Sequence, residues 1–512
     1  MKTLVYGNIY TMNCSHPFAE AMCMEDGVIQ AIGNREQFDV RAMDQVLDYS
    51  EQFIFPGFID THVHTSPCGA LMTGVQVHGE TTIAGVLDAI EKRVKTEPSG
   101  QWIFVAGFQD KNMQEKRFPN LEELDQISTS HPIMIIHNDL HPYMCNSCAI
   151  EQLHLDPKVD GVETNENNEP NGMVVDPYCM PVLEEISRIM PEEELISGYR
   201  KMDEYAVSNG ITTVFTKDFY PMQRILWENR DRFKTTTYPM IIIGDCTNES
   251  EICRATEDPD FAKRATLCVF GDGAFDGWSA SAIEPYKDRP SSFGMLYHSD
   301  EELYSFIERV HLEGMQASVH AIGDNAIDQV LHVYEKVLKK YPRGDHRHRI
   351  EHFECPTKRA IAKAAELGVA LGMQPLLLEV CEGMDMEGYR CFIGDRVERC
   401  SPFRSILDMG ILVGGGSDFS VTEMKPLRAI MIGMQHPMPE ERFTLAEGLK
   451  MFTYDAAKLG HLEDRKGRLI SGLDADFIVL NQNPFAVKTE ELSDICVEYT
   501  FCRGNLVYSK NN

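Results

Sequence analysis

The stretch FPGFIDTHVHTS, residues 55–66, places two histidines one residue apart directly behind an apolar run. In a β-strand, residues i and i+2 point to the same face, so His62 and His64 can converge on one metal ion while Val63 faces the other way. A short motif of this kind also arises by chance, as two surface histidines at the end of a strand. Further ligands must therefore come from the rest of the chain.

Short β-rich runs, separated by helical stretches, follow this first run along the chain. They read GITTVFTKD, YPMIIIGD, LCVFGDGAF, MQASVHAIGD, HRIEHF, GVALGMQP and GILVGGGSD, and FIDTHVH brings the number of predicted strands to eight. Eight buried, nearly continuous apolar strands that alternate with helices are typical of an α/β protein with a (β/α)8 TIM barrel.

The two ends of the chain share a different pattern, in which short apolar runs alternate with turns. We therefore predict a small β-sandwich domain built from both termini, residues 1–55 plus 465–512. The barrel is expected at residues 56–464, with an insertion at about 68–200 after the first barrel strand. A chain of 512 residues with 43% hydrophobic residues is long enough for one large core and a smaller domain.

Charge and cysteine usage narrow the class of partners. The formal net charge of −31 would repel a phosphate backbone, so nucleic acid and anionic membrane surfaces are not expected partners. No apolar run reaches membrane-spanning length, and the first residues do not resemble a signal peptide. The 15 cysteines are scattered without the spacing of a disulfide framework, which indicates reduced thiols and a cytoplasmic location.

Polar residues stand at or just after the carboxyl ends of the predicted barrel strands, where TIM barrels carry their chemistry. Candidate metal ligands in these positions are His62, His64, His320, His352 and Asp418. Residues from different strands need not be neighbours in sequence to converge at the mouth of a barrel. Imidazole nitrogens with one carboxylate suit Zn²⁺ or another divalent transition ion.

The order of several motifs resembles that of a known family over nearly the whole chain. PGFIDTHVH, VHAIGDNAID, RHRIEHF, GMQP, GGGSD and GLDADFIVLNQNPF are similar to motifs of the amidohydrolase superfamily (Amidohydrolase 3), in its N-substituted formamide deformylase-like branch. The resemblance implies a TIM barrel with a composite β-sandwich and a hydrolytic metal site that holds one or two ions. It implies that His62 and His64 bind the more buried ion and that His320 and His352 bind the second.

The resemblance also gives Asp418 two roles, as a metal ligand and as the catalytic group that takes a proton from the attacking water. Chemistry supports these roles independently. A divalent ion lowers the pKa of bound water to about 7, and a neighbouring carboxylate can accept the proton and return it to the leaving nitrogen.

One position departs from the family pattern. The fourth barrel strand of the family usually carries a lysine that becomes carboxylated and bridges two metal ions, whereas this chain has Cys268 there, in LCVFGDG. Three alternatives follow: a mononuclear site, a site with the Cys268 thiolate as a ligand, or a carbamate supplied by Lys217 from the end of TVFTK. Thiolates bind zinc well, although a buried cysteine is more often an inert packing residue.

Three further residues are candidates for substrate binding. His141, in NDLHPYMCNS, matches a recurring histidine of the family and could contact the substrate or stabilise the insertion. Asp272 and Gln374 close barrel strands and could orient the substrate or the metal ligands, or serve ordinary loop hydrogen bonds. Glu351 directly precedes His352, so strand alternation predicts that it points away from the site and is structural.

The sequence therefore predicts a metal-dependent hydrolase that cleaves a non-peptide C–N bond, in the amide or formamide of a small molecule. A mononuclear-metal deaminase of the same superfamily is the main alternative, and a non-catalytic scaffold with this fold is the other. Fold analogy cannot identify the substrate. The expected partner is a small molecule, and homo-oligomerisation stays open.

Overall fold

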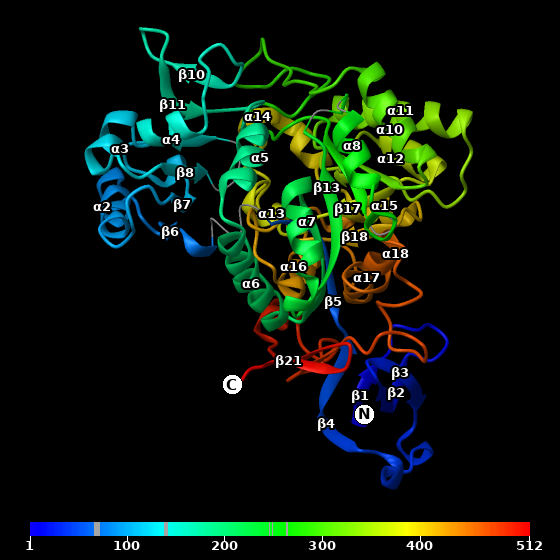
Figure 1. The fold of residues 1–512 in the computed structure, drawn as a ribbon. Helices are drawn as coiled ribbons and strands as arrows, with labels where there is room; N and C mark the ends of the chain where they lie inside the picture. The colour runs from blue at the N-terminus through cyan, green and yellow to red at the C-terminus, as the bar shows by residue number, and fades with distance from the viewer. Residues whose placement is uncertain (66–71, 138–141, 245, 248, 263–264, 512) are drawn as a thin grey trace.

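The centre of the protein is an eight-stranded parallel sheet (Figure 1). The computed structural model describes residues 1–65, 72–137, 142–244, 246–247, 249–262 and 265–511. The barrel strands are β5 (Phe58–His64), β12 (Ile211–Phe219), β13 (Thr236–Ile242), β14 (Thr266–Phe270), β15 (Gln316–Ala321), β16 (Arg349–His352), β17 (Ala370–Met373) and β18 (Val413–Gly415). They pair in sequence order from β5 to β18, and these are the eight strands predicted from the sequence.

Backbone contacts join the last strand to the first. The chain just beyond β18 forms a parallel bridge between Phe419 and Val63. The amide of Asp418 donates to the carbonyl of His62 at 2.9 Å, and the amide of His64 donates to the carbonyl of Phe419 at 2.8 Å. The predicted (β/α)8 barrel is confirmed, and its closure lies next to the candidate ligands.

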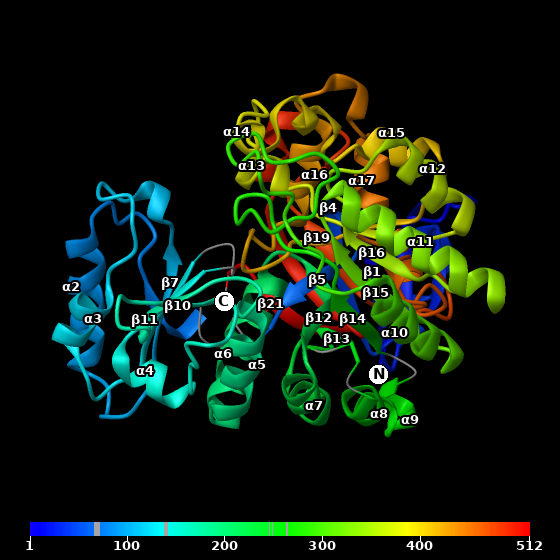
Figure 2. The ribbon, with the colours of Figure 1, turned by 90° about the horizontal axis from the view of Figure 1, so that it is seen from above.

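Helices cover the outside of the barrel (Figure 2). In α11, Ile327, Val330, Tyr334 and Val337 recur at helical spacing and are buried, which explains why this segment forms a helix against the sheet. The outer helices are α6 (Glu192–Ser208), α7 (Tyr220–Glu228), α8 (Glu249–Thr256), α9 (Pro259–Ala262), α10 (Asp300–Leu312), α11 (Asp324–Lys340), α12 (Lys358–Leu367), α15 (Phe403–Asp408), α16 (Pro426–Met434), α17 (Leu445–Met451) and α18 (Tyr454–Leu459).

Both ends of the chain meet in one seven-stranded sheet below the barrel (Figure 1). Its order is β21-β20-β19-β4-β1-β2-β3, so C-terminal strands pair with N-terminal ones. The strands are β1 (Lys2–Tyr10), β2 (Phe18–Glu25), β3 (Val28–Gly33), β4 (Gln45–Pro56), β19 (Phe477–Leu480), β20 (Val497–Cys502) and β21 (Asn505–Ser509). Phe477 and Phe501 stack at 4.3 Å between ring centroids in its core. Strands from both termini thus form one sheet, as a β domain built from both ends requires, while the predicted bounds of the β-sandwich, residues 1–55 plus 465–512, stay a prediction.

The part of the chain that connects β5 to β12 forms another, mixed sheet, which lies beside the barrel (Figure 2). Its strands are β6 (Val75–Gln76), β7 (Ile103–Phe108), β8 (Ile133–His137), β9 (Tyr143–Cys145), β10 (Val162–Thr164) and β11 (Pro170–Val174), with helices α2 (Ile83–Val94), α3 (Leu121–Ile127) and α4 (Ser147–Gln152). Val105, Ile135 and Ile90 belong to its own apolar core. Helix α5 (Cys179–Ile189) follows this sheet and precedes α6. The sequence predicted an insertion here but not its sheet.

None of the described helices is long and apolar enough to cross a membrane. The cellular compartment stays a prediction.

Candidate metal centre

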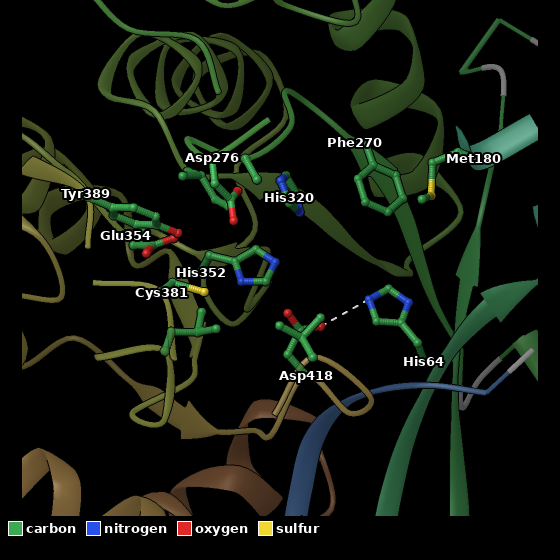
Figure 3. A pocket seen from close by; sticks show the side chains of 14 residues that line it. His64, Met180, Phe270, Asp276, His320, His352, Glu354, Cys381, Tyr389 and Asp418 are labelled. Atoms are coloured by element: carbon green, nitrogen blue, oxygen red, sulfur yellow. Dashed lines mark ion pairs between the residues drawn. The ribbon is translucent and has the colours of Figure 1, made fainter. Parts of the chain in front are cut away.

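Four of the five side chains predicted as metal ligands, His64, His320, His352 and Asp418, line one cavity at the mouth of the barrel (Figure 3). One ligand atom from each of His62, His352 and Asp418 lies within 4.8 Å of the other two, and all three residues are buried. The Oδ1 atom of Asp418 is 3.2 Å from Nε2 of His62 and 3.1 Å from Nε2 of His64. Residues from the first, sixth and eighth barrel strands therefore converge on one point.

Strand β5 carries one extra residue next to the site. Val214 of β12 pairs with Asp60 of β5, and Thr216 pairs with Val63. Two residue steps along β12 therefore correspond to three along β5. Bulges of this kind turn side chains away from the regular alternation. The chain after β18 lies close to this bulge, because a Cβ on Gly416 would lie 2.9 Å from the backbone nitrogen of His62.

Hydrogen bonding sets the tautomer of His62. Its Nδ1 atom donates to Oε2 of Glu351 at 2.8 Å, and a carboxylate offers only acceptor atoms, so the ring proton is on Nδ1. Burial lowers the pKa of His62 to about 3, helped by the nearby charge of Lys217. The imidazole is therefore neutral at physiological pH, and its Nε2 lone pair points into the site, as a metal ligand requires.

The hydrogen-bond partner of His62 is Glu351, which the sequence analysis predicted to be structural and to point away from the site. Glu351 also accepts from Ser318 Oγ at 2.6 Å and from Arg349 at 2.9 Å. Burial alone would raise the pKa of Glu351, but the Arg349 guanidinium and the His62 hydrogen bond outweigh it and hold the pKa well below its usual value. Glu351 is thus a buried carboxylate that orients a candidate ligand. The sequence signal was the pair of charged residues at alternate positions of RIEH, in a segment predicted to be a buried strand.

His352 occupies an unusual backbone conformation at the end of β16. Its φ is 66° and that of Phe353 is 49°, whereas residues with a side chain rarely adopt positive φ. Its Nδ1 lies 2.9 Å from the side-chain oxygen Oε1 of Gln374, so Nδ1 donates and Nε2 carries the lone pair. Asp418 also has a positive φ, of 54°. Strained backbone of this kind is concentrated at functional sites.

His320 lies beside these residues on β15. Its ring centroid is 4.5 Å from that of His352 and 5.0 Å from that of Phe270. Its Nε2 faces the carbonyl of Gly273 at 3.3 Å, which makes Nε2 the donor and leaves the lone pair on Nδ1. His320 therefore presents a different ring nitrogen from His62 and His352.

The donor set suits a divalent cation. Asp418 is 6% exposed, and its Oδ1 has no well-directed hydrogen bond with a described residue despite the two nearby imidazoles. Burial would raise the pKa of Asp418, but His62, His64 and His352 lower it well below its usual value, so the group is a carboxylate. The Nε2 lone pair of His62 thus faces the Oδ1 atom of Asp418. These two electron-rich atoms repel each other, and a cation bound by both would remove the repulsion. The residues therefore fit a metal ion such as Zn²⁺.

The two alternatives to the family's bridging lysine occupy different surroundings. Lys217, on β12, is fully buried, with its Nζ 3.3 Å from Nε2 of His62 and 4.6 Å from the centre of the Phe270 ring. Burial lowers the pKa of Lys217. Cys268 belongs instead to an apolar cluster with Phe215 and Tyr238. Burial raises the pKa of the Cys268 thiol to about 12, which keeps it protonated.

The three candidate substrate residues have different positions. Gln374 contacts His352 and so orients a candidate ligand. Asp272 accepts three backbone hydrogen bonds, from Ser281 at 2.8 Å, Gly323 at 2.9 Å and Ile322 at 3.0 Å, and thereby ties together the loops after β14 and β15. It is not among the described residues that line the cavity. His141 lies outside the described residues.

A cavity of about 50 Å³ opens onto the candidate ligands. His64, His320, His352 and Asp418 line it, and so does Glu354, which sequence reasoning did not single out. Burial raises the pKa of Glu354 well above its usual value, and the neighbouring Glu382 raises it further. The nearby Tyr389 hydroxyl lowers the pKa of Glu354 in part. Its geometry is not that of a well-directed hydrogen bond to the carboxyl group. The sequence signal for Glu354 was its position, two residues after the candidate ligand His352.

The barrel and the ligand cluster at its mouth are the arrangement expected of a metal-dependent hydrolase. The chain belongs to the amidohydrolase family, whose model matches residues 45–508. It is 25% identical over 541 residues to the Bacillus subtilis protein YtcJ, with 100% of both chains covered. It is 24% identical over 545 residues to an N-substituted formamide deformylase from Arthrobacter pascens, which covers 99% of this chain and 98% of the relative.

A solved structure shows the same fold. An uncharacterized metal-dependent hydrolase from Pyrococcus horikoshii superposes with a TM-score of 0.79 and 21% identity, over 96% of this chain and 99% of that chain. This likeness extends through the terminal sheet and the insertion as well as the barrel, because it covers nearly all of both chains.

Proposed function

We propose that this protein hydrolyses the amide or formamide bond of a small molecule, at a site that holds Zn²⁺ or a similar divalent ion. The observation that carries the proposal is the buried Asp418 carboxylate, which faces His62 and His64 within 3.2 Å. The similarity to an N-substituted formamide deformylase supports a C–N bond outside ordinary peptides as the target.

Each residue of the site has a distinct role in this proposal. His62, His64, His320, His352 and Asp418 would hold the metal, whose chemistry is to activate water and polarise the substrate carbonyl. Asp418 takes the proton of the attacking water and delivers it to the nitrogen as the C–N bond breaks, because an unprotonated amide nitrogen leaves poorly. Glu351 and Gln374 keep the ring protons of His62 and His352 on the side away from the metal.

Lys217, rather than Cys268, is the proposed source of an additional oxygen ligand. Burial lowers the pKa of Lys217, which favours the neutral amine, and a neutral amine can add to CO2 and release one proton to give a carbamate. The position of its Nζ beside His62 supports this role. Cys268 lacks support because it packs in an apolar cluster with Phe215 and Tyr238. A site of two ions follows from a carbamate, and a site of one ion follows without it.

Elemental analysis together with a substrate panel tests the proposal. Protein purified without added metal should contain bound zinc or a similar ion and should release a carboxylate from N-formyl or N-acyl amines. His320→Ala should lower metal content in a folded barrel, whereas His332→Ala, at an exposed position of α11, should leave it unchanged. Metal content that is the same in His62→Ala, His320→Ala and the parent would refute the assignment of the ligands.

The products separate this reaction from the two alternatives. A deaminase of the same superfamily would release ammonia and no carboxylate. A non-catalytic scaffold would turn over no member of the panel, even with metal bound.

A further inference from the structure

One wall of the cavity carries an acid that the proposed reaction does not use. Glu354 is 2% exposed and lines the cavity beside Tyr389, on the side of His352 away from His64 (Figure 3). Neither of its carboxyl oxygens has a well-directed hydrogen bond with a described residue. A buried polar oxygen without a donor destabilises the folded chain, so a donor that enters the cavity would be stabilised there.

The surroundings of Glu354 favour a positively charged donor. Asp276 and Asp418 line the same cavity, and no lysine or arginine is among the described residues that line it. Glu382 is fully buried, and its charge raises the pKa of Glu354. One of its oxygens accepts from Ser401, while the other has no partner among the described residues. The chain as a whole carries a net charge of −31, which attracts cations to the site.

The lining of the cavity favours a compact cation. Phe270, Leu377 and Tyr389 contribute apolar and aromatic surface. A primary ammonium offers three donors on a compact group, and aromatic rings attract cations. A guanidinium is larger and planar, and a phosphate would be repelled by the acids.

We propose that Glu354 determines specificity by binding a primary ammonium group of the substrate. The favoured substrates are then formamides or amides that carry a free alkylammonium, such as the N-formyl derivatives of short diamines. This inference rests on the proposed function for the reaction, but it concerns the other end of the substrate. The opposing explanation is that Glu354 and Glu382 form a purely structural pair that shares a proton.

A pair of matched probes distinguishes the two explanations. We compare N-formyl diaminoalkanes with N-formyl alkylamines of equal length, near neutral pH, where a primary alkylamine is protonated. The zinc-loaded parent should prefer the ammonium probe by about tenfold to a hundredfold in kcat/KM, as expected for a hydrogen bond to a charged group. Equal kcat/KM for the two probes across the series would overturn the proposal.

Two variants locate the preference. Glu354→Gln keeps the size of the side chain but cannot become a carboxylate when an ammonium group binds, so it should abolish the preference, mainly through a higher KM for the ammonium probe. Glu382→Gln is the matched control, because Glu382 is equally buried but does not line the cavity. It should retain the preference. Loss of the preference to the same extent in both variants would assign it to the buried pair and overturn the contact proposed here.

A binding measurement is independent of turnover. Unmodified diaminoalkanes should bind the zinc-loaded parent in calorimetry, and Glu354→Gln should bind them at least about tenfold more weakly. If diamines bind in this way but no formamide is hydrolysed, the ammonium site stands and the proposed reaction fails. If neutral formamides are hydrolysed but diamines do not bind, the reaction stands and the ammonium site fails. The comparison of probes on the parent decides the matter even if Glu354→Gln does not fold.

Discussion

His62 and Glu351, from the first and sixth strands of the barrel, are joined by a hydrogen bond of 2.8 Å from Nδ1 to Oε2. The bond fixes which nitrogen of the imidazole is free to bind a cation. It also places the basicity of a candidate ligand under the control of a carboxylate, which Arg349 keeps ionised.

Glu351→Gln should weaken metal binding by about tenfold to a hundredfold, the usual cost of losing a residue that orients a ligand. A glutamine can present its amide NH2 to Nδ1 and so move the ring proton to Nε2. Metal titration followed by calorimetry measures the effect, with circular dichroism as the check on folding. Ser318→Ala is the control, since it removes another hydrogen bond to Glu351 without changing the proton on His62. Parent-like affinity in Glu351→Gln would show that the tautomer does not matter.

Asp418→Asn should retain the fold and most of the bound metal but lose turnover by about 10²–10⁴-fold, the range for a missing general acid or base. Asparagine preserves the size and one oxygen, yet it cannot carry the proton from water to the leaving nitrogen. Steady-state hydrolysis of an active N-formyl or N-acyl amine, alongside metal analysis, measures both properties. Turnover near the parent rate would move the proton transfer to another group.

Lys217→Gln and Cys268→Ser should differ in metal content. The lysine variant should lose bound metal, and the intact parent should gain the mass of one CO2 on Lys217 in native mass spectrometry. The cysteine variant should keep the metal content of the parent, because Cys268 packs among apolar residues. Loss of metal in Cys268→Ser, with full retention in Lys217→Gln, would favour the thiolate alternative instead.

Gly416→Ala should lower both stability and metal affinity, because the added Cβ would stand 2.9 Å from the backbone nitrogen and the Cβ of His62. Overpacking of this kind costs about 1–3 kcal/mol in the free energy of unfolding. Gly344→Ala is the matched control, as its Cβ would meet nothing within 4 Å. Thermal unfolding and metal titration compare the two variants. Equal behaviour would mean that the chain beyond β18 yields without moving His62.

Glu382→Gln should become progressively more stable than the parent as the pH rises. Burial raises the pKa of Glu382 from 4.5 to about 8 in the folded protein, although the Ser401 hydroxyl opposes this shift. The folded state therefore holds the proton more tightly than the unfolded state, so the parent loses stability as the pH rises through this range. Glutamine has no such proton. Denaturant unfolding at several pH values gives the difference, and a constant difference between pH 4.5 and 8 would contradict the shifted pKa.

Much of the barrel could be predicted because its signals are local. The eight strands are continuous apolar runs, and the polar residues that follow them mark the carboxyl ends of the strands. The interpretation of Glu351 failed because regular alternation was assumed up to the end of β16. A φ of 66° at His352 breaks that alternation, so His352 and Glu351 both contribute to the same site.

Other features depend on distant parts of the chain and leave no local pattern. Glu354 becomes notable only when Tyr389 and Glu382, from a later segment, surround it and neither of its oxygens has a well-directed hydrogen bond with a described residue. The proximity of Lys217 to His62 likewise depends on the pairing of β12 with β5. The role of Cys268 could not be settled from the sequence, because only the packing distinguishes a ligand from an apolar contact.

The seam of the barrel has a thermodynamic consequence. The barrel closes where its first strand, which carries His62, meets the chain just after its last strand, which carries Asp418. There the amide of Asp418 donates to the carbonyl of His62 at 2.9 Å. An ion bound by both side chains would link residues 62 and 418 and so close a loop that contains nearly the entire barrel. Closing so long a loop in the folded state carries a large entropic cost, which metal binding would offset. Chelation should therefore lower the cooperativity and midpoint of global unfolding, rather than loosening only the active-site loops.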